Sequence, residues 1–133
     1  MAILIQGNYE EVAWKHLYPK LNPDWEFYKK ADEAGLFKIF TARNPTKLVG
    51  YWWVFVRNNP HYKDVLQGAD DIIYFLPEHR GKAVFDFMER CLGLLKHMGV
   101  EVMVVHCKVA HDLEKLYLGL GFEPYEKNYI RRL

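Results

Sequence analysis

Apolar and polar positions follow two different periods along the chain, and changes between them mark the predicted elements. Apolar runs of strand length, rich in aromatic and β-branched residues, predict strands at 2–5, 36–41, 47–56, 70–76, 100–106 and one or two more within 122–130. Segments with a helical period predict helices at 9–17, 25–34 and 83–97, and a last one that contains Tyr117 and ends at Gly121. This order predicts a mixed α/β fold in a single domain, residues 1–133.

Capping residues support several of these boundaries. Asn8, Asp24 and Asp112 stand where a helix N-cap is expected, and Gly35 and Gly99 follow predicted helix ends. The turn residues Arg43-Asn44-Pro45-Thr46 separate the strands at 36–41 and 47–56, which predicts a hairpin. Tyr51, Trp52, Trp53 and Phe55 predict a strand buried on both faces, rather than a platform on which bases stack.

Composition narrows the function classes. Half of the 133 residues are hydrophobic and the formal net charge is +1, which argues against disorder and against a general nucleic-acid binder. No apolar run approaches the roughly 20 residues that a bilayer span needs, so we expect no membrane association. Cys91 and Cys107 form no disulfide framework, and we expect a cytoplasmic protein, with a virion location as the alternative.

The most informative stretch joins the strand at 70–76 to the helix at 83–97 through a basic turn that contains Gly81. The first turn of a helix leaves backbone N–H groups unpaired, and the positive end of the helix dipole lies behind them. Such a junction suits a phosphate or diphosphate group, and Arg80 and Lys82 add positive charge. The turn lacks the Gly-Lys-Ser/Thr ending of a nucleotide-binding P-loop.

Two segments resemble motifs of the GCN5-related N-acetyltransferases. Glu78-His79-Arg80-Gly81-Lys82-Ala83 resembles the acyl-CoA-binding motif Q/R-x-x-G-x-G/A, with Glu in place of the first Gln or Arg. Leu116-Tyr117-Leu118-Gly119-Leu120-Gly121-Phe122 is similar to the late motif L-Y-x-x-x-G-F. The resemblance implies the acyl-CoA N-acyltransferase fold, in which helices flank a central, mostly antiparallel sheet. It also implies transfer of acetyl from acetyl-CoA to a primary amine of a small molecule or protein.

The resemblance further implies which residues hold acetyl-CoA. The backbone N–H groups of Arg80, Gly81, Lys82, Ala83 and Val84 would bind the diphosphate. The strand end at Phe75 and Leu76 would pair with the pantetheine arm, and a backbone N–H there would polarise the thioester carbonyl.

Tyr117 falls where many members of that family place the tyrosine that protonates the departing thiolate. A tyrosine has an ordinary pKa near 10, above that of a free thiol, so it suits a general acid. The sequence leaves more than one candidate for the general base that accepts the amine proton. Asp71, beside Asp70 at the opening of the strand at 70–76, and His61 in the preceding loop are the candidates, with His106 as an alternative.

The residues His106, Cys107 and His111 do not follow a common zinc spacing, so we expect no metal. The resemblance extends to phage-encoded acetyltransferase-like proteins, and Ala110 and Leu113 stand where the family usually has Asn and Ala. A catalytically inactive scaffold, for example a phage virion-associated or host-modulating binding protein, is therefore the second hypothesis. A homodimer or a viral or host protein partner stays open.

Overall fold

The computed structural model describes all 133 residues, and its core is a four-stranded sheet in the order β1-β2-β3-β4. β1 (Phe37–Arg43), β2 (Leu48–Asn58) and β3 (Leu66–Phe75) are antiparallel neighbours, and β4 (Val102–Val104) is parallel to β3. The helices are α1 (Ala2–Val12), α2 (Trp25–Glu33), α3 (Lys82–His97) and α4 (Glu114–Gly119), with a short 3-10 turn η1 (Pro77–His79) before α3. The predicted mixed α/β fold with a mostly antiparallel sheet is confirmed.

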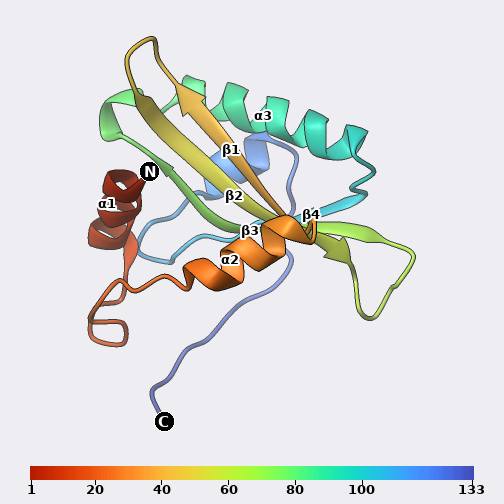
Figure 1. Cartoon of the computed structure of the whole chain (residues 1–133), viewed down its shortest axis with the longest axis horizontal. Coiled ribbons are helices and arrows are strands. Elements are labelled where there is room, and N and C mark those ends of the chain that lie inside the picture. Colours follow the sequence, from red (N-terminus) through yellow and green to blue (C-terminus); the bar gives the residue numbers. More distant parts are fainter.

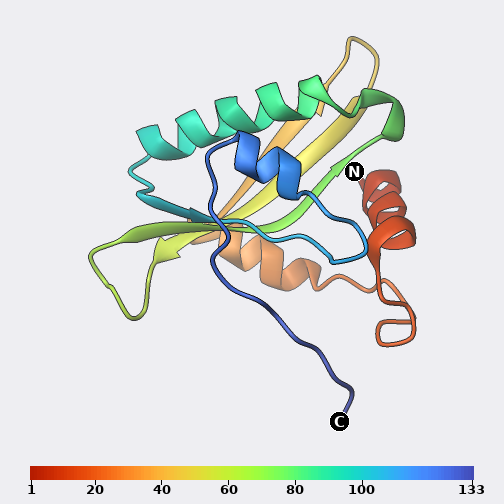
Figure 2. The same cartoon turned by 180° about the vertical axis from the view of Figure 1, so that it is seen from behind.

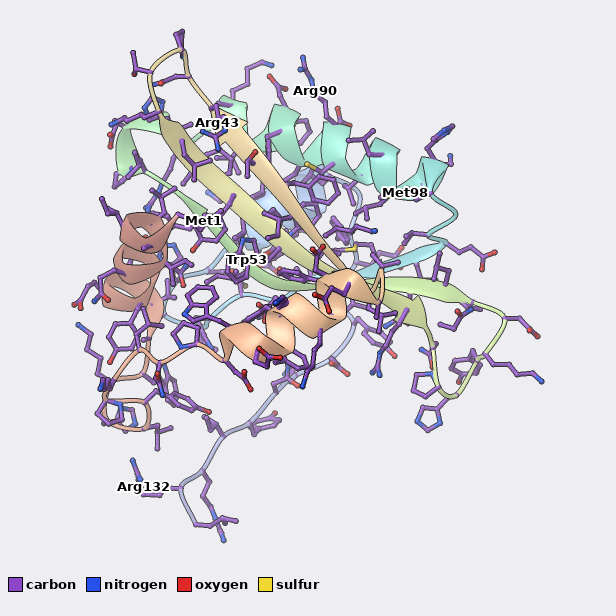
Figure 3. All side chains as sticks on the ribbon, viewed as in Figure 1. Met1, Arg43, Trp53, Arg90, Met98 and Arg132 are labelled. Carbon is purple, nitrogen blue, oxygen red and sulfur yellow. The ribbon has the colours of Figure 1, made fainter.

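Helices cover both faces of the sheet, because β2 is apolar on both faces. Trp52 and Val54 point into one core with α3 and α4, where Met88 and Leu95 are buried. Tyr51 and Trp53 point to the opposite face, into a second core with α1 and α2. Figures 1 and 2 show α3 and α4 together on one face and α2 on the other, and Figure 3 labels Trp53 between the sheet and α2. Because successive side chains of β2 point to opposite faces of the sheet, this one apolar strand contributes to both cores.

Several predicted boundaries are confirmed. The Asp24 side chain accepts a hydrogen bond from the Phe27 N–H at 2.9 Å and caps α2. Gly35 and Gly99 follow α2 and α3 with φ of 74° and 95°, a left-handed conformation that glycine adopts without strain.

The predicted strand at 2–5 is wrong, since these residues begin α1. The apolar run Ala2-Ile3-Leu4-Ile5 suits a strand or one buried helical turn, and tertiary packing decides for the helix. Leu4 and Ile5 are buried against the second core. Asn8 lies inside α1 and caps no helix; its side-chain amide instead donates to the Ile73 carbonyl at 3.4 Å.

The predicted strand or strands in the tail at 122–130 are also wrong. No strand forms there, because the chain after α4 continues as an extended tail with no neighbouring strand to pair with (Figure 2). β3 begins at Leu66 rather than at Asp70, and β4 is shorter than the predicted 100–106. No helix is both long enough and apolar enough to cross a bilayer.

Gly50 allows β2 and β3 to approach closely, and its replacement by alanine tests this packing. A Cβ built on Gly50 would lie 2.5 Å from a carbon of the Phe75 ring. Since the site is buried and overpacking is destabilising, we expect Gly50→Ala to lower the free energy of unfolding by about 1–3 kcal/mol in urea titrations. Gly93→Ala is the control, because a Cβ there meets no atom within 4 Å. Equal stability of the two variants would contradict the close packing.

Candidate active site

The turn between η1 and α3 presents three unpaired backbone N–H groups. Val84 and Phe85 N–H bond to the Gly81 carbonyl, whereas the N–H groups of Gly81, Lys82 and Ala83 have no acceptor in the chain. Gly81 has φ 96° and ψ −134°, a conformation that only glycine adopts readily, and a Cβ there would enter open space. No acidic residue lies in the first turn of the 16-residue helix. The turn can therefore receive an anion through its backbone.

A pocket of about 240 Å³ opens beside this turn. It lies among α1, the end of β3, the turn and the segment that leads into α4. Its walls are mostly apolar and are formed by Asn8, Glu11, Val12, Ile73, Tyr74, Phe75, Arg80, Gly81, Val84, His111, Leu113 and Leu116. An apolar pocket with few polar groups and an anion site at its mouth suits a long ligand with a charged end.

One wall of the pocket is the free edge of β3. β4 pairs with β3 only as far as Ala69 and Val104, so no strand lies beside the rest of β3. The carbonyls of Ile73 and Phe75 point away from β2, since they accept hydrogen bonds from the Asn8 amide and from Arg80 Nε at 2.9 Å. In an antiparallel strand the N–H of a residue points to the same side as its carbonyl. The edge can therefore pair with an extended ligand as a further strand would.

Arg80 turns its guanidinium toward α1 rather than toward the turn. Its Nη1 and Nη2 donate to the two carboxylate oxygens of Glu11 at 2.8 and 2.6 Å. His111 Nε2 lies 3.1 Å from the same carboxylate, and the Arg80 guanidinium lies over the Tyr74 ring. The hydrogen bonds from Arg80 lower the pKa of Glu11. This ion pair neutralises the arginine and holds α1 over the pocket.

The predicted cofactor-binding residues divide into three groups. Phe75, Arg80, Gly81 and Val84 line the pocket. Lys82 and Ala83 begin α3, and the Lys82 ammonium lies 2.7 Å from Asp86 along the helix. Three of the predicted backbone groups are already paired: the N–H groups of Leu76, Arg80 and Val84 donate to the carbonyls of Val49, Pro77 and Gly81 at 2.9, 3.3 and 3.0 Å. These three N–H groups are therefore not free for a ligand.

Tyr117 lies next to the point where β3 and β4 separate. It is buried, and its hydroxyl donates to the His106 carbonyl at 2.7 Å. Burial raises the pKa of Tyr117, and the nearby Asp70 carboxylate adds to the shift. The phenol therefore stays protonated at neutral pH, which is the state that a general acid needs.

The structure separates the two predicted bases. Asp71 lies inside β3, at a register shift where it pairs with no residue of β2, and accepts a hydrogen bond from the Tyr28 hydroxyl at 2.6 Å. His61 lies in the loop before β3, where its backbone N–H donates to the Asn59 side chain. This loop is at the end of β3 opposite the turn, about 30 Å away along the ten-residue strand. The structure does not bring His61 to the pocket.

Three residues of this region were not predicted as parts of the site: Asn8, Glu11 and His111, which line the pocket. Asp70, considered beside Asp71 as a candidate base, instead binds His106. Glu11 and Arg80 are 69 residues apart, and Asp70 and His106 are 36 residues apart. Contacts between residues so far apart leave no signal in local spacing. The sequence shows only that charged residues stand next to the motifs. No group of three or more His, Cys, Asp or Glu side chains is arranged to hold a metal ion.

Comparison with known proteins finds similarity in structure and none in sequence. No protein-family model matches the chain, and no curated protein matches it. Among solved structures, an aminoglycoside acetyltransferase from an uncultured soil metagenomic sample matches with a TM-score of 0.73 at 15% identity, covering 98% of this chain and 88% of that one. The ribosomal-protein-alanine N-acetyltransferase of Brucella melitensis biovar Abortus 2308 matches with 0.70 at 19% identity, covering 99% and 90%.

A third similar structure includes the expected ligand. A predicted acetyltransferase of Clostridium acetobutylicum, solved with acetyl-CoA, matches with a TM-score of 0.68 at 11% identity over 98% of this chain and 88% of that one. Likeness at such identities shows the fold. The chain has the fold of the GCN5-related N-acetyltransferases, as the two sequence motifs predicted.

Proposed function

We propose that the protein is an N-acetyltransferase that moves acetyl directly from acetyl-CoA to a primary amine. One observation carries the proposal: the unpaired N–H groups of Gly81, Lys82 and Ala83 lie at the mouth of an apolar pocket that borders a free strand edge. A diphosphate, a pantetheine arm with amide groups and an acetyl thioester need these features in this order. The similar acetyltransferase folds support the same ligand.

The backbone of the turn would bind the diphosphate, with the dipole of α3 behind it. The edge of β3 would pair with the amides of the arm, and the Phe75 N–H would face the ligand. Acetyl-CoA supplies the acetyl group as a thioester. When the amine nitrogen bonds to the acetyl carbon and the carbon–sulfur bond breaks, Tyr117 would donate its proton to the thiolate. Asp71 remains a predicted base.

Glu11 places a negative charge beside the site proposed for a diphosphate, and its removal should strengthen binding. In Glu11→Gln, Arg80 loses its carboxylate partner and one like charge disappears from the pocket. Two unit charges about 4 Å apart in water interact by about 1 kcal/mol, so we expect acetyl-CoA to bind roughly fivefold more tightly by calorimetry.

Glu10→Gln is the matched control, since Glu10 pairs with Lys15 on the exposed side of α1 and lies outside the pocket. It should leave the affinity unchanged. Weaker binding in Glu11→Gln alone would mean that the ion pair shapes the pocket rather than competing with the ligand.

One observation favours the second candidate, a catalytically inactive scaffold. Asn8 and Arg80 occupy the two β3 carbonyls that a pantetheine amide would use. The experiment that separates the candidates incubates the protein with acetyl-CoA and single amines: an amino sugar, an aminoglycoside, a peptide with N-terminal alanine and a lysine peptide. The first three represent the acceptors of similar structures, which are acetyltransferases of glucosamine-6-phosphate, of aminoglycosides and of ribosomal-protein alanine. An enzyme gives one acetylated amine per coenzyme A released, whereas a scaffold gives none with any acceptor.

A further inference from the structure

A buried carboxylate and a half-exposed imidazole form a close pair at the point where β3 and β4 separate. The Asp70 side chain is only 3% exposed, and its Oδ1 lies 2.6 Å from His106 Nδ1. The same oxygen accepts the backbone N–H of His106 at 3.0 Å. Two contacts between one oxygen and one residue fix the position and the orientation of the imidazole.

The pair also determines which ring nitrogen is available. Hydrogen bonding to a carboxylate keeps the proton on Nδ1, which leaves the lone pair of the neutral ring on Nε2. The His106 side chain is 48% exposed, so this nitrogen can meet a substrate. A buried acid behind a solvent-facing histidine is the arrangement by which enzymes orient a general base.

The location of the pair connects it with the proposed reaction. β3 and β4 last pair at Ala69 and Val104, and Asp70 is the next residue of β3. The free edge from Phe75 back to Asp71 is about 13 Å long. A pantetheine arm that starts at the turn and follows this edge of β3 would end beside Asp70 and His106. Figure 2 shows the chain leave the sheet after β4 and approach α1 before it enters α4.

The geometry points to His106 as the general base of the acetyl transfer and to Asp70 as its positioning residue. This inference rests on the proposed function and names the group that accepts the proton. As the nitrogen–carbon bond forms and the carbon–sulfur bond breaks, the amine proton moves to His106 Nε2 and the thiolate receives a proton from Tyr117. The Tyr117 hydroxyl donates to the His106 backbone carbonyl, so one hydrogen bond links the acid directly to the residue that carries the base.

The charges around His106 determine the direction of its pH dependence. Asp70 and Asp71 of β3 raise the pKa of His106, Asp70 chiefly through its hydrogen bond, whereas burial and Lys108 oppose the shift. Tyr117, the contact from α4, stays protonated at neutral pH and adds no charge. The base is active when neutral, so kcat/KM should rise with pH through a value above the ordinary 6.5 of histidine.

The test measures acetyl transfer against pH with an acceptor that the amine screen identifies. His106→Gln should lower kcat at least about 100-fold at neutral pH and keep KM for acetyl-CoA within about twofold. It should also abolish the acidic limb of the pH profile, which is the rise of kcat/KM with pH. Asp70→Asn should lower kcat and move this limb to lower pH, because the neutral amide no longer stabilises the imidazolium. His97→Gln, at the exposed end of α3, is the matched control and should behave as wild type.

A second readout needs no turnover. NMR of histidine-labelled protein should show the His106 ring respond to acetyl-CoA, but not to 3′-phosphoadenosine 5′-diphosphate, the nucleotide half of coenzyme A that carries the diphosphate and lacks the pantetheine arm. An active His106→Gln enzyme with an unchanged pH profile would overturn the role of His106 and leave the proposed function intact. A wild-type protein whose melting temperature ignores acetyl-CoA would overturn both, so the two failures are distinguishable.

Discussion

Gly81→Glu is expected to weaken acetyl-CoA binding at least about 100-fold, which corresponds to about 2.7 kcal/mol. The carboxylate would enter the open space in front of the unpaired N–H groups, where the proposed diphosphate binds. Like charges brought together in a binding site cost several kcal/mol, and the new side chain also occupies the anion site itself. Isothermal titration calorimetry measures the difference.

Two controls separate this effect from damage to the fold. Gly93→Glu adds the same charge to the exposed side of α3, where nothing lies within 4 Å of a Cβ, and should leave the affinity unchanged. Lys82→Glu adds negative charge at a residue with helical backbone and should also weaken binding, without the strain that any side chain meets at Gly81. Wild-type affinity in both Gly81→Glu and Lys82→Glu would exclude the turn as the diphosphate site.

Tyr117→Phe is expected to lower kcat about 100-fold or more, while KM for acetyl-CoA changes little. General acid catalysis contributes about 10²–10⁴-fold to a rate, and the hydroxyl is the only group that the substitution removes. The variant also leaves the His106 carbonyl without its hydrogen bond, which should lower the free energy of unfolding by about 1–3 kcal/mol. Steady-state kinetics and urea unfolding measure the two effects separately.

Tyr125→Phe is the matched control, because this tyrosine lies exposed in the tail. It should change neither kinetics nor stability. A Tyr117→Phe enzyme that loses stability but keeps its kcat would assign Tyr117 a structural role alone. Solvent would then have to supply the proton to the leaving thiolate.

The parts of the fold that local chemistry determines could be predicted from sequence. The unbroken apolar and aromatic run of β2 predicts burial on both faces, the Asp24 side chain caps α2, and Gly81 marks the turn before α3. The strands predicted at 2–5 and at 122–130 were wrong for a shared reason. A short apolar segment becomes a strand only when a sheet edge lies beside it, and the edge is a property of the whole fold.

The same distinction applies to the candidate site. The unpaired N–H groups of the turn follow from neighbouring residues around Gly81 and were expected at this junction of a strand and a helix. The ion pair of Glu11 with Arg80 and the contact between Asp70 and His106 join segments far apart in the chain. Their residue types suggest chemistry, but only the packing of α1 over β3, and the separation of β4 from β3, brings the partners together.

The most direct test of the central claim is the melting temperature of the wild-type protein with and without acetyl-CoA. A ligand at one hundred times its dissociation constant stabilises the folded state by about 2.7 kcal/mol, so the melting temperature should rise by several degrees. The nucleotide half alone, 3′-phosphoadenosine 5′-diphosphate, should give a smaller rise, because it reaches the turn but not the edge of β3. An unchanged melting temperature at millimolar acetyl-CoA would contradict the account and would leave a fold of acetyltransferase type without its acetyl donor.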